Sequence, residues 1–151
     1  MGNLSGWVQT NCKTIFWWAV MLILIYFPLF MNLGDLAVRW YDESHMAVIS
    51  YEMTTSHNWI VQHCNGIIDM VNTKPPLMMW AEAGLIKLMG ISELTIRLPA
   101  AISAALTCIV LMIFSQNFMK NFWAGFAAVL VLVTTRGYVC IHGSRTGDYD
   151  T

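Results

Sequence analysis

The sequence predicts an all-α integral membrane protein with about three transmembrane helices and two further helices in a long first outer loop. Three observations predict this class. Hydrophobic residues form 57% of the 151 residues and charged residues only 11%, whereas soluble domains have about 25% charged residues. Mean hydropathy is +0.56. Long uncharged segments alternate with polar ones, so the bilayer rather than water is the expected solvent.

The first two spans are predicted from their lack of charge. Residues 14–34 contain no charged side chain, and at about 1.5 Å per residue they extend about 30 Å, the thickness of a hydrocarbon core. Pro28 falls in the last third of this span. Residues 98–119 form the second span, and we expect Pro99 to occupy the first turn, where a helix needs no backbone donor. Small residues here favour close helix packing: Ala100, Ala101, Ser103, Ala104 and Ala105.

A third span is predicted over residues 122–141, with Arg136 at the interface. Two crossings then separate residues 35–97 from residues 142–151, so these two polar segments must lie on the same side of the membrane. All nine acidic residues share that side, with six of the eight basic ones. The positive-inside rule, counted from Lys and Arg alone, places this side in the cytoplasm.

The loop over residues 35–97 contains two helical patterns. Residues 42–56 have Met46, Ile49 and Met53 at helical spacing. Residues 77–89 follow two prolines and stop at a glycine, and they are too few to cross a bilayer. We expect both helices to lie on the membrane surface, within a single membrane region over residues 1–151.

Composition also excludes several function classes. A net charge of -1 gives no positive field for a phosphate backbone, so nucleic acid is not an expected partner. The cysteines are far apart and form no CxxC pair, which indicates neither a zinc knuckle nor a disulfide framework: Cys12, Cys64, Cys108 and Cys140.

Two groups of residues in the outer loop are candidates for chemistry. Asp42 and Glu43 are adjacent acids just beyond a membrane span, where a carboxylate can act as a general base; the alternative is that Asp42 caps a helix. Lys74 precedes two prolines that hold its ammonium near a helix start, which suits an anionic phosphate. Its alternative is an interfacial Lys that extends toward water.

The C-terminal segment is the third candidate. His142, Arg145, Asp148 and Asp150 combine a cation with two carboxylates, between Gly143 and Gly147. Two acids at this spacing can bind a divalent metal ion or orient hydroxyl groups. A solvated interfacial loop would have the same composition, so both interpretations stay open. The remaining histidines have no convincing metal-ligand spacing.

Several motifs occur in a recognisable order. They are DE at 42–43, EM at 52–53, Trp59, NG at 65–66, NTKPPL at 72–77, Trp80, GISEL at 90–94, RLPAA at 97–101 and HGSRTGDYD at 142–150. In these motifs the sequence closely resembles the N-terminal part of bacterial membrane glycosyltransferases of the dolichyl-phosphate-mannose protein mannosyltransferase and aminoarabinose transferase type. The resemblance covers nearly everything after Leu24.

The resemblance implies the N-terminal portion of a larger, multi-span C-type glycosyltransferase fold, with the later part of that fold absent from these residues. It implies transfer of a sugar from a polyprenyl-phosphate-linked donor to a glycan, lipid or protein acceptor at the outer face of the inner membrane. Asp42 and Asp148 match the family's two acidic positions, with Glu43 beside the first. Lys74 and Arg145 match positions near the lipid phosphate, and Asp150 and His142 are further substrate-binding candidates.

Two departures from the family pattern qualify this reading. Thr73 stands where some relatives have an acid that binds a metal, so a divalent metal ion is a candidate cofactor without an assigned site. Met46 stands where relatives have Tyr. A chain of this length also leaves open an alternative function, that of a non-catalytic membrane scaffold or accessory subunit.

Overall fold

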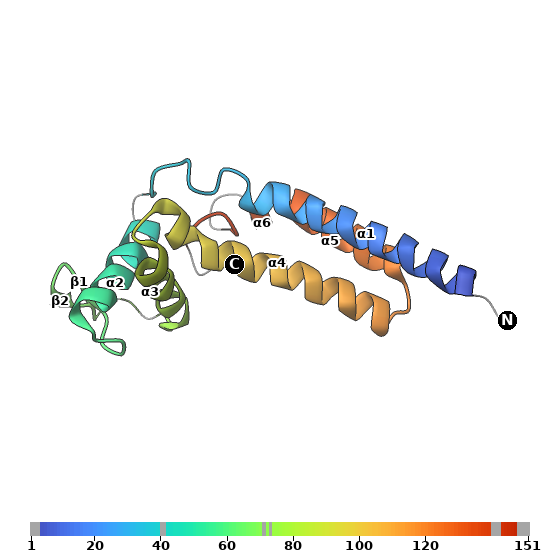
Figure 1. Ribbon diagram of the computed structural model, residues 1–151. Coiled ribbons are helices and arrows are strands. Elements are labelled where there is room, and N and C mark those ends of the chain that lie inside the picture. The colour runs from blue at the N-terminus through green and yellow to red at the C-terminus, as the bar shows by residue number, and fades with distance from the viewer. Residues whose placement is uncertain (1–3, 40–41, 71, 73, 140–142, 148–151) are drawn as a thin grey trace.

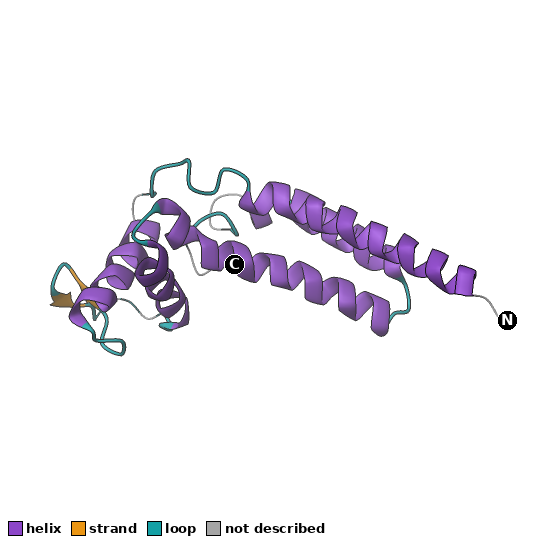
Figure 2. Cartoon of the chain, in the orientation of Figure 1, coloured by secondary structure: helices purple, strands orange, loops and turns teal. Residues whose placement is uncertain are grey.

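The computed structural model describes residues 4–39, 42–70, 72, 74–139 and 143–147, with side chains described from residue 13 onward. This part of the chain is mostly helical, with one short β-hairpin (Figures 1 and 2). The elements are α1 (Leu4–Phe30), α2 (Asp42–Ser56), β1 (His63–Cys64), β2 (Ile67–Ile68), α3 (Leu77–Met89), α4 (Glu93–Asn117), α5 (Phe122–Thr134) and α6 (Arg136–Val139).

Three helices, α1, α4 and α5, lie side by side and form an elongated bundle (Figure 1). α4 runs antiparallel to α1, and α5 turns back beside both, so that the Trp17 ring of α1 contacts Trp123 and Phe126 of α5. The end of α1, the start of α4 and the end of α5 therefore meet at one end of the bundle. α2 and α3 lie beyond that end.

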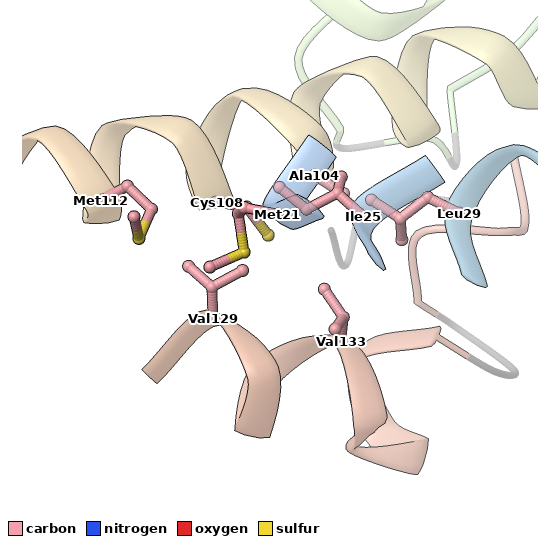
Figure 3. Packing of buried hydrophobic residues seen from close by; sticks show 8 residues of the cluster. All are labelled: Met21, Ile25, Leu29, Ala104, Cys108, Met112, Val129 and Val133. Carbon is pink, nitrogen blue, oxygen red and sulfur yellow. The ribbon is translucent and has the colours of Figure 1, made fainter. Parts of the chain in front are cut away.

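The bundle core consists of side chains spaced four residues apart on each helix (Figure 3). This spacing places them on one face of each helix. The buried set is Met21, Ile25 and Leu29 from α1, Ala104, Cys108 and Met112 from α4, and Val129 and Val133 from α5. Close approach depends on small residues, as predicted: Ala100, Ala101 and Ala104 are buried, and a Cβ at Gly125 of α5 would lie 2.8 Å from the Cβ of Ser115.

The opposite faces of these helices expose large apolar side chains. Two helical segments, Lys13–Phe30 and Glu93–Asn117, are long and apolar enough to cross a membrane. Exposed residues on them include Phe16, Ile23 and Phe27 of α1 and Leu106 and Val110 of α4. Helices surrounded by the hydrocarbon of a bilayer need an apolar outer surface as well as an apolar core. The exposed apolar faces of α1 and α4 therefore agree with the first two predicted spans.

The third predicted span is divided in the structure. α5 ends at Thr134, Thr135 is extended with φ -74° and ψ 127°, and α6 begins at Arg136. The hydroxyl groups of Thr134 and Thr135 donate to the carbonyls of Leu130 and Val131, and such bonds compete with helix continuation. Residues 140–141 of the predicted span lie outside the described residues.

The predicted position of Pro99 was wrong, because α4 begins earlier than residue 98. Ser92 caps the helix: its side chain accepts from the Thr95 amide at 3.3 Å, and the Thr95 hydroxyl accepts from the Ser92 amide at 3.1 Å. This reciprocal capping box starts α4 at Glu93. Pro99 therefore lies beyond the first turn, where it cannot donate to the Thr95 carbonyl.

The two helices of the outer loop have the predicted bounds. α2 and α3 pack against each other through a second core, formed by Met46, Ile49 and Met53 of α2 with Met79 and Ala83 of α3. α3 also packs against α4. The two helices thus form one unit that is joined to the bundle. Their position on a membrane surface stays a prediction.

The β-hairpin between α2 and α3 is a local addition to the all-α prediction. His63 pairs with Ile68 and Cys64 with Ile67. Asn65 and Gly66 form the two-residue turn with φ of 56° and 76°. Asn-Gly is the strongest short-range signal for such a turn, so the sequence contained this information.

Candidate functional site

A buried ion pair joins the outer loop to the bundle at the end where the three helices meet. The Arg97 Nε of α4 donates to Glu43 Oε1 of α2 at 2.6 Å, and Arg97 Nη2 donates to Glu43 Oε2 at 3.2 Å. Both residues are only 3% exposed. A bidentate pair of this kind fixes the two side chains in orientation as well as in distance.

Arg97 also binds the chain that leaves α1. Nη1 donates to the carbonyls of Leu33 and Leu36, at 3.0 and 2.7 Å, and Nη2 donates to the carbonyl of Ala37 at 3.0 Å. With the two bonds to Glu43, all five guanidinium N–H groups have acceptors. Sequence analysis did not single out Arg97 as a functional side chain, because its partners are remote along the chain.

Glu43 is equally well bonded, which bears on its predicted catalytic role. Its carboxylate also accepts from the backbone amides of Arg39, at 2.7 Å, and Gly147, at 3.1 Å. Burial alone would raise the pKa of Glu43, yet the bonds from Arg97 and the two amides outweigh it and lower the pKa below 4.5. A carboxylate that is fully bonded and stays ionised is better suited to positioning its neighbours than to accepting a proton.

The bond from Gly147 to Glu43 brings the C-terminal segment to the outer loop. Gly147 lies so close to α4 that a Cβ there would be 2.7 Å from Ile96 Cγ2. Ser144 is buried and bonds the Tyr138 carbonyl through its amide and hydroxyl groups. Residues 143–147 thus pack against the start of α4, and the two polar segments predicted to share one side do meet.

Asp42 is the first residue of α2, one position before Glu43, and is partly buried. Because Tyr41 lies outside the described residues, the alternative interpretation of Asp42 as a helix cap stays a prediction. At the first helical position, the Asp42 carboxylate still benefits from the positive helix end. Through the Glu43 to Gly147 bond, Asp42 lies one residue from the contact that holds the C-terminal segment.

Lys74 belongs to the loop that precedes α3. Its amide donates to Asn72 Oδ1 at 3.0 Å, and its carbonyl accepts from Gln62 Nε2 at 3.3 Å. Asn72 in turn reaches Met46 Sδ of α2 at 3.9 Å. The loop that contains Lys74 is therefore held against the N-terminal half of α2, the helix that begins with Asp42.

Arg145 binds the end of α1. Its Nη2 donates to the carbonyls of Met31 and Asn32, the latter at 3.2 Å. A cation is favourable beside the negative end of a helix. Arg145 also borders a cavity of about 580 Å³, whose wall contains Arg39, Arg97 and Arg136.

Three predicted site residues, His142, Asp148 and Asp150, lie outside the described residues. The structure describes a sequence neighbour of His142 and one of Asp148. Gly143 and Gly147, which adjoin His142 and Asp148, are both buried. The structure therefore brings together the segments that contain Asp42 and Arg145, with Glu43 and Arg97 between them.

A second buried acid, Glu82 of α3, was not predicted to be functional. It is 0% exposed, and its Oε2 accepts from the Ser50 hydroxyl of α2 at 2.6 Å. Its Oε1 is buried without a partner among the described residues. Burial raises the pKa of Glu82 to about 7, only partly offset by the Ser50 bond and increased further by the Glu43 charge.

A third polar group involves a histidine. His45 Nε2 lies 2.6 Å from Asp69 Oδ2, and His45 Nδ1 lies 3.7 Å from Cys64 Sγ. Burial raises the pKa of the Cys64 thiol, and the Asp69 and Glu52 carboxylates raise it further, which disfavours the nucleophilic thiolate. In the part of the chain that the structure describes, no three His, Cys, Asp or Glu side chains form a metal site, so the metal ion stays a prediction.

Comparison with known proteins identifies the fold. No protein-family model and no curated protein matches the chain. Two solved structures do match, both of ArnT from Cupriavidus metallidurans, an aminoarabinose transferase with a C-type glycosyltransferase fold. The structure bound to undecaprenyl phosphate is 27% identical with a TM-score of 0.63, over 86% of this chain. The apo structure is 25% identical with a TM-score of 0.64, over 83% of this chain.

The comparison confirms the resemblance that the motifs indicated. The chain spans 22% of the length of each ArnT structure that it matches. The activity, substrates and partners of a whole enzyme are accordingly matters for proposal.

Proposed function

The chain shares its fold with a membrane aminoarabinose transferase. We propose that the chain is part of a glycosyltransferase that uses a polyprenyl-phosphate-linked sugar donor. The acceptor is a glycan, lipid or protein at the outer face of the inner membrane. One observation carries this proposal. The amide of Gly147, the residue before Asp148 in the sequence, donates to Glu43, the residue after Asp42, and this bond supports a site to which both segments contribute.

The residue types suit this reaction. A polyprenyl phosphate leaves readily only when its developing negative charge is neutralised, and a fixed cation in a partly dehydrated site does this better than water. Lys74 and Arg145 are the candidate cations. The acceptor must lose a proton as it attacks the anomeric carbon, and Asp42 is the candidate base.

Glu43 is given a positioning role in place of its predicted catalytic one. Its carboxylate holds Arg97, the Arg39 amide and the Gly147 amide simultaneously. Loss of these bonds would separate Asp42 from the C-terminal segment. Asp148, Asp150 and His142 keep their predicted roles as proposals.

We propose that residues 122–141, which include α5 and α6, form the third crossing, because the 13 residues of α5 alone are too few to cross a bilayer. The end of the bundle near α2 then lies on the outer face. α5 has a continuous apolar sequence and packs along α1 and α4, which supports a shared depth in the bilayer. The positive-inside rule opposes this orientation, but two of the cations that it counts are bonded within the fold. Arg97 is neutralised by Glu43, and Arg145 binds helix-end carbonyls.

The direct test is Asp42→Asn in the full-length protein. We expect sugar transfer to be abolished while membrane insertion and yield stay unchanged, because the amide cannot accept the acceptor's proton. Asp35→Asn, which removes an exposed carboxylate from the same loop, is the matched control and should leave transfer intact. Wild-type turnover by Asp42→Asn would remove this residue from the mechanism and favour the non-catalytic alternative.

Lys74→Ala tests the donor cation separately. We expect weaker use of the lipid-linked donor, seen as a raised KM for donor and an unchanged KM for acceptor. Lys13→Ala, an exposed cation toward the far end of α1, is the control. An unchanged donor KM would assign Lys74 to the interfacial alternative.

A further inference from the structure

The cavity at the end of the bundle is lined by several arginines. It has a volume of about 580 Å³, which is within the usual range for small-ligand sites. Arg39, Arg136 and Arg145 border it together with Arg97, and Lys74 does not. No acidic side chain among the described residues lines it.

The four guanidinium groups are not equivalent. Arg97 has its five N–H groups bonded and its charge balanced by Glu43. Arg145 uses one nitrogen for the carbonyls at the end of α1. Arg39 and Arg136 have no carboxylate partner in the described part of the chain. Three guanidinium groups without a carboxylate partner among the described residues therefore line one cavity, which favours an anion there.

The rest of the wall is apolar. Leu33, Leu36 and Val139 line the same cavity. They belong to the segment that follows α1 and to α6, where the predicted spans meet the headgroup region. Arginines beside apolar side chains at this level suit a ligand with a phosphate next to an acyl chain.

We propose that this cavity binds the phosphate of a membrane-lipid headgroup, through Arg39 and Arg136, at a site that Lys74 does not line. The inference rests on the bilayer placement given under the proposed function. It adds a second anion position to that function, because Lys74, a candidate cation for the donor phosphate, does not line this cavity.

Binding measurements on the purified full chain in neutral detergent test the proposal. The probes are dioctanoyl phosphatidic acid, dioctanoylglycerol without phosphate, and inorganic phosphate. We expect phosphatidic acid to bind and dioctanoylglycerol not to bind. Arg39→Gln and Arg136→Gln should each weaken phosphatidic acid binding about tenfold, the usual effect of one charge-assisted hydrogen bond. Arg136→Lys should retain part of the affinity, and Lys13→Gln should retain all of it.

Competition with undecaprenyl phosphate distinguishes one site from two. Saturating phosphatidic acid should leave undecaprenyl phosphate bound, and Lys74→Ala should weaken only undecaprenyl phosphate. Full displacement would show a single shared site and overturn the inference. Equal losses of phosphatidic acid affinity in Lys13→Gln and Arg136→Gln would show an effect of general surface charge. That result would also overturn the inference. Equal affinity for inorganic phosphate would assign the cavity to free phosphate and overturn the lipid assignment.

Failure of the cavity site and failure of the proposed function give different results. Loss of transfer in Asp42→Asn with unchanged phosphatidic acid binding in the arginine variants would refute the cavity site alone. Retained transfer in Asp42→Asn with weakened binding in those variants would refute the catalytic proposal alone. Circular dichroism of each variant confirms that its helices are intact.

Discussion

Glu82→Gln should remove a pH dependence that the fold builds into α3. The wild-type carboxyl has a pKa of about 7 in the folded chain, against an ordinary value of 4.5. Because the folded pKa is raised, the neutral form is favoured on folding. The stability from this group is therefore complete below pH 4.5 and is lost as the pH rises toward 7.

The magnitude follows from the two pKa values. The interval from 4.5 to about 7 corresponds to about 3 kcal/mol of unfolding free energy, lost by pH 8. Gln keeps the acceptor for the Ser50 hydroxyl but cannot ionise. The free-energy difference between the Gln variant and the wild type should therefore grow by about 3 kcal/mol between pH 4.5 and 8.

Thermal unfolding in neutral detergent, followed by circular dichroism at several pH values, measures this difference. The expected change in the Tm difference is roughly 6–12 °C for a chain of this size. Asp35→Asn is the control, since it removes an exposed carboxylate and should show no such trend. A Tm difference that stays constant from pH 4.5 to 8 would refute the argument that burial controls the Glu82 charge.

Two further changes test the ion pair and the packing of the bundle. Glu43→Gln should lower the free energy of unfolding by about 3–5 kcal/mol, because Arg97 then stays buried without its counter-charge. Faster amide hydrogen exchange in residues 143–147 would report release of the C-terminal segment. Unchanged exchange there would contradict the positioning role of Glu43. Gly125→Ala should cost about 1–3 kcal/mol through overlap with Ser115. Gly84→Ala has open space in α3 and should be neutral or stabilising; equal losses in the two alanine variants would refute the packing argument.

The local signals in the sequence were sufficient for the secondary structure of the outer loop. α2 and α3 have the predicted bounds, because their helical spacing, the prolines before residue 77 and Gly90 are all local features. Two local motifs in the sequence explain the two differences between the predicted and the observed secondary structure. Ser92 and Thr95 formed a capping box that moved the start of α4, and Asn65-Gly66 formed a hairpin turn.

The sequence also predicted some features of the candidate site and not others. The motifs indicated Asp42, Lys74 and Arg145 and the family resemblance that comparison confirmed. They did not show that Glu43 is committed to an ion pair, nor that Arg97 is its partner, because a sequence motif specifies residue types without their hydrogen bonds. The assignment of Lys74 and Arg145 to the lipid phosphate comes from the family resemblance and stays a prediction.

The sequence by itself predicted helices long and apolar enough to cross a membrane, and two polar segments on one side of it, because charge and hydropathy are properties of each residue. Tertiary structure decided which polar groups are satisfied and which face a cavity. Glu43 meets Arg97, 54 residues away, and Gly147, 104 residues away. Such contacts depend on how the helices pack, and the sum of burial and hydrogen bonds at each carboxylate fixes its charge only after that packing has formed.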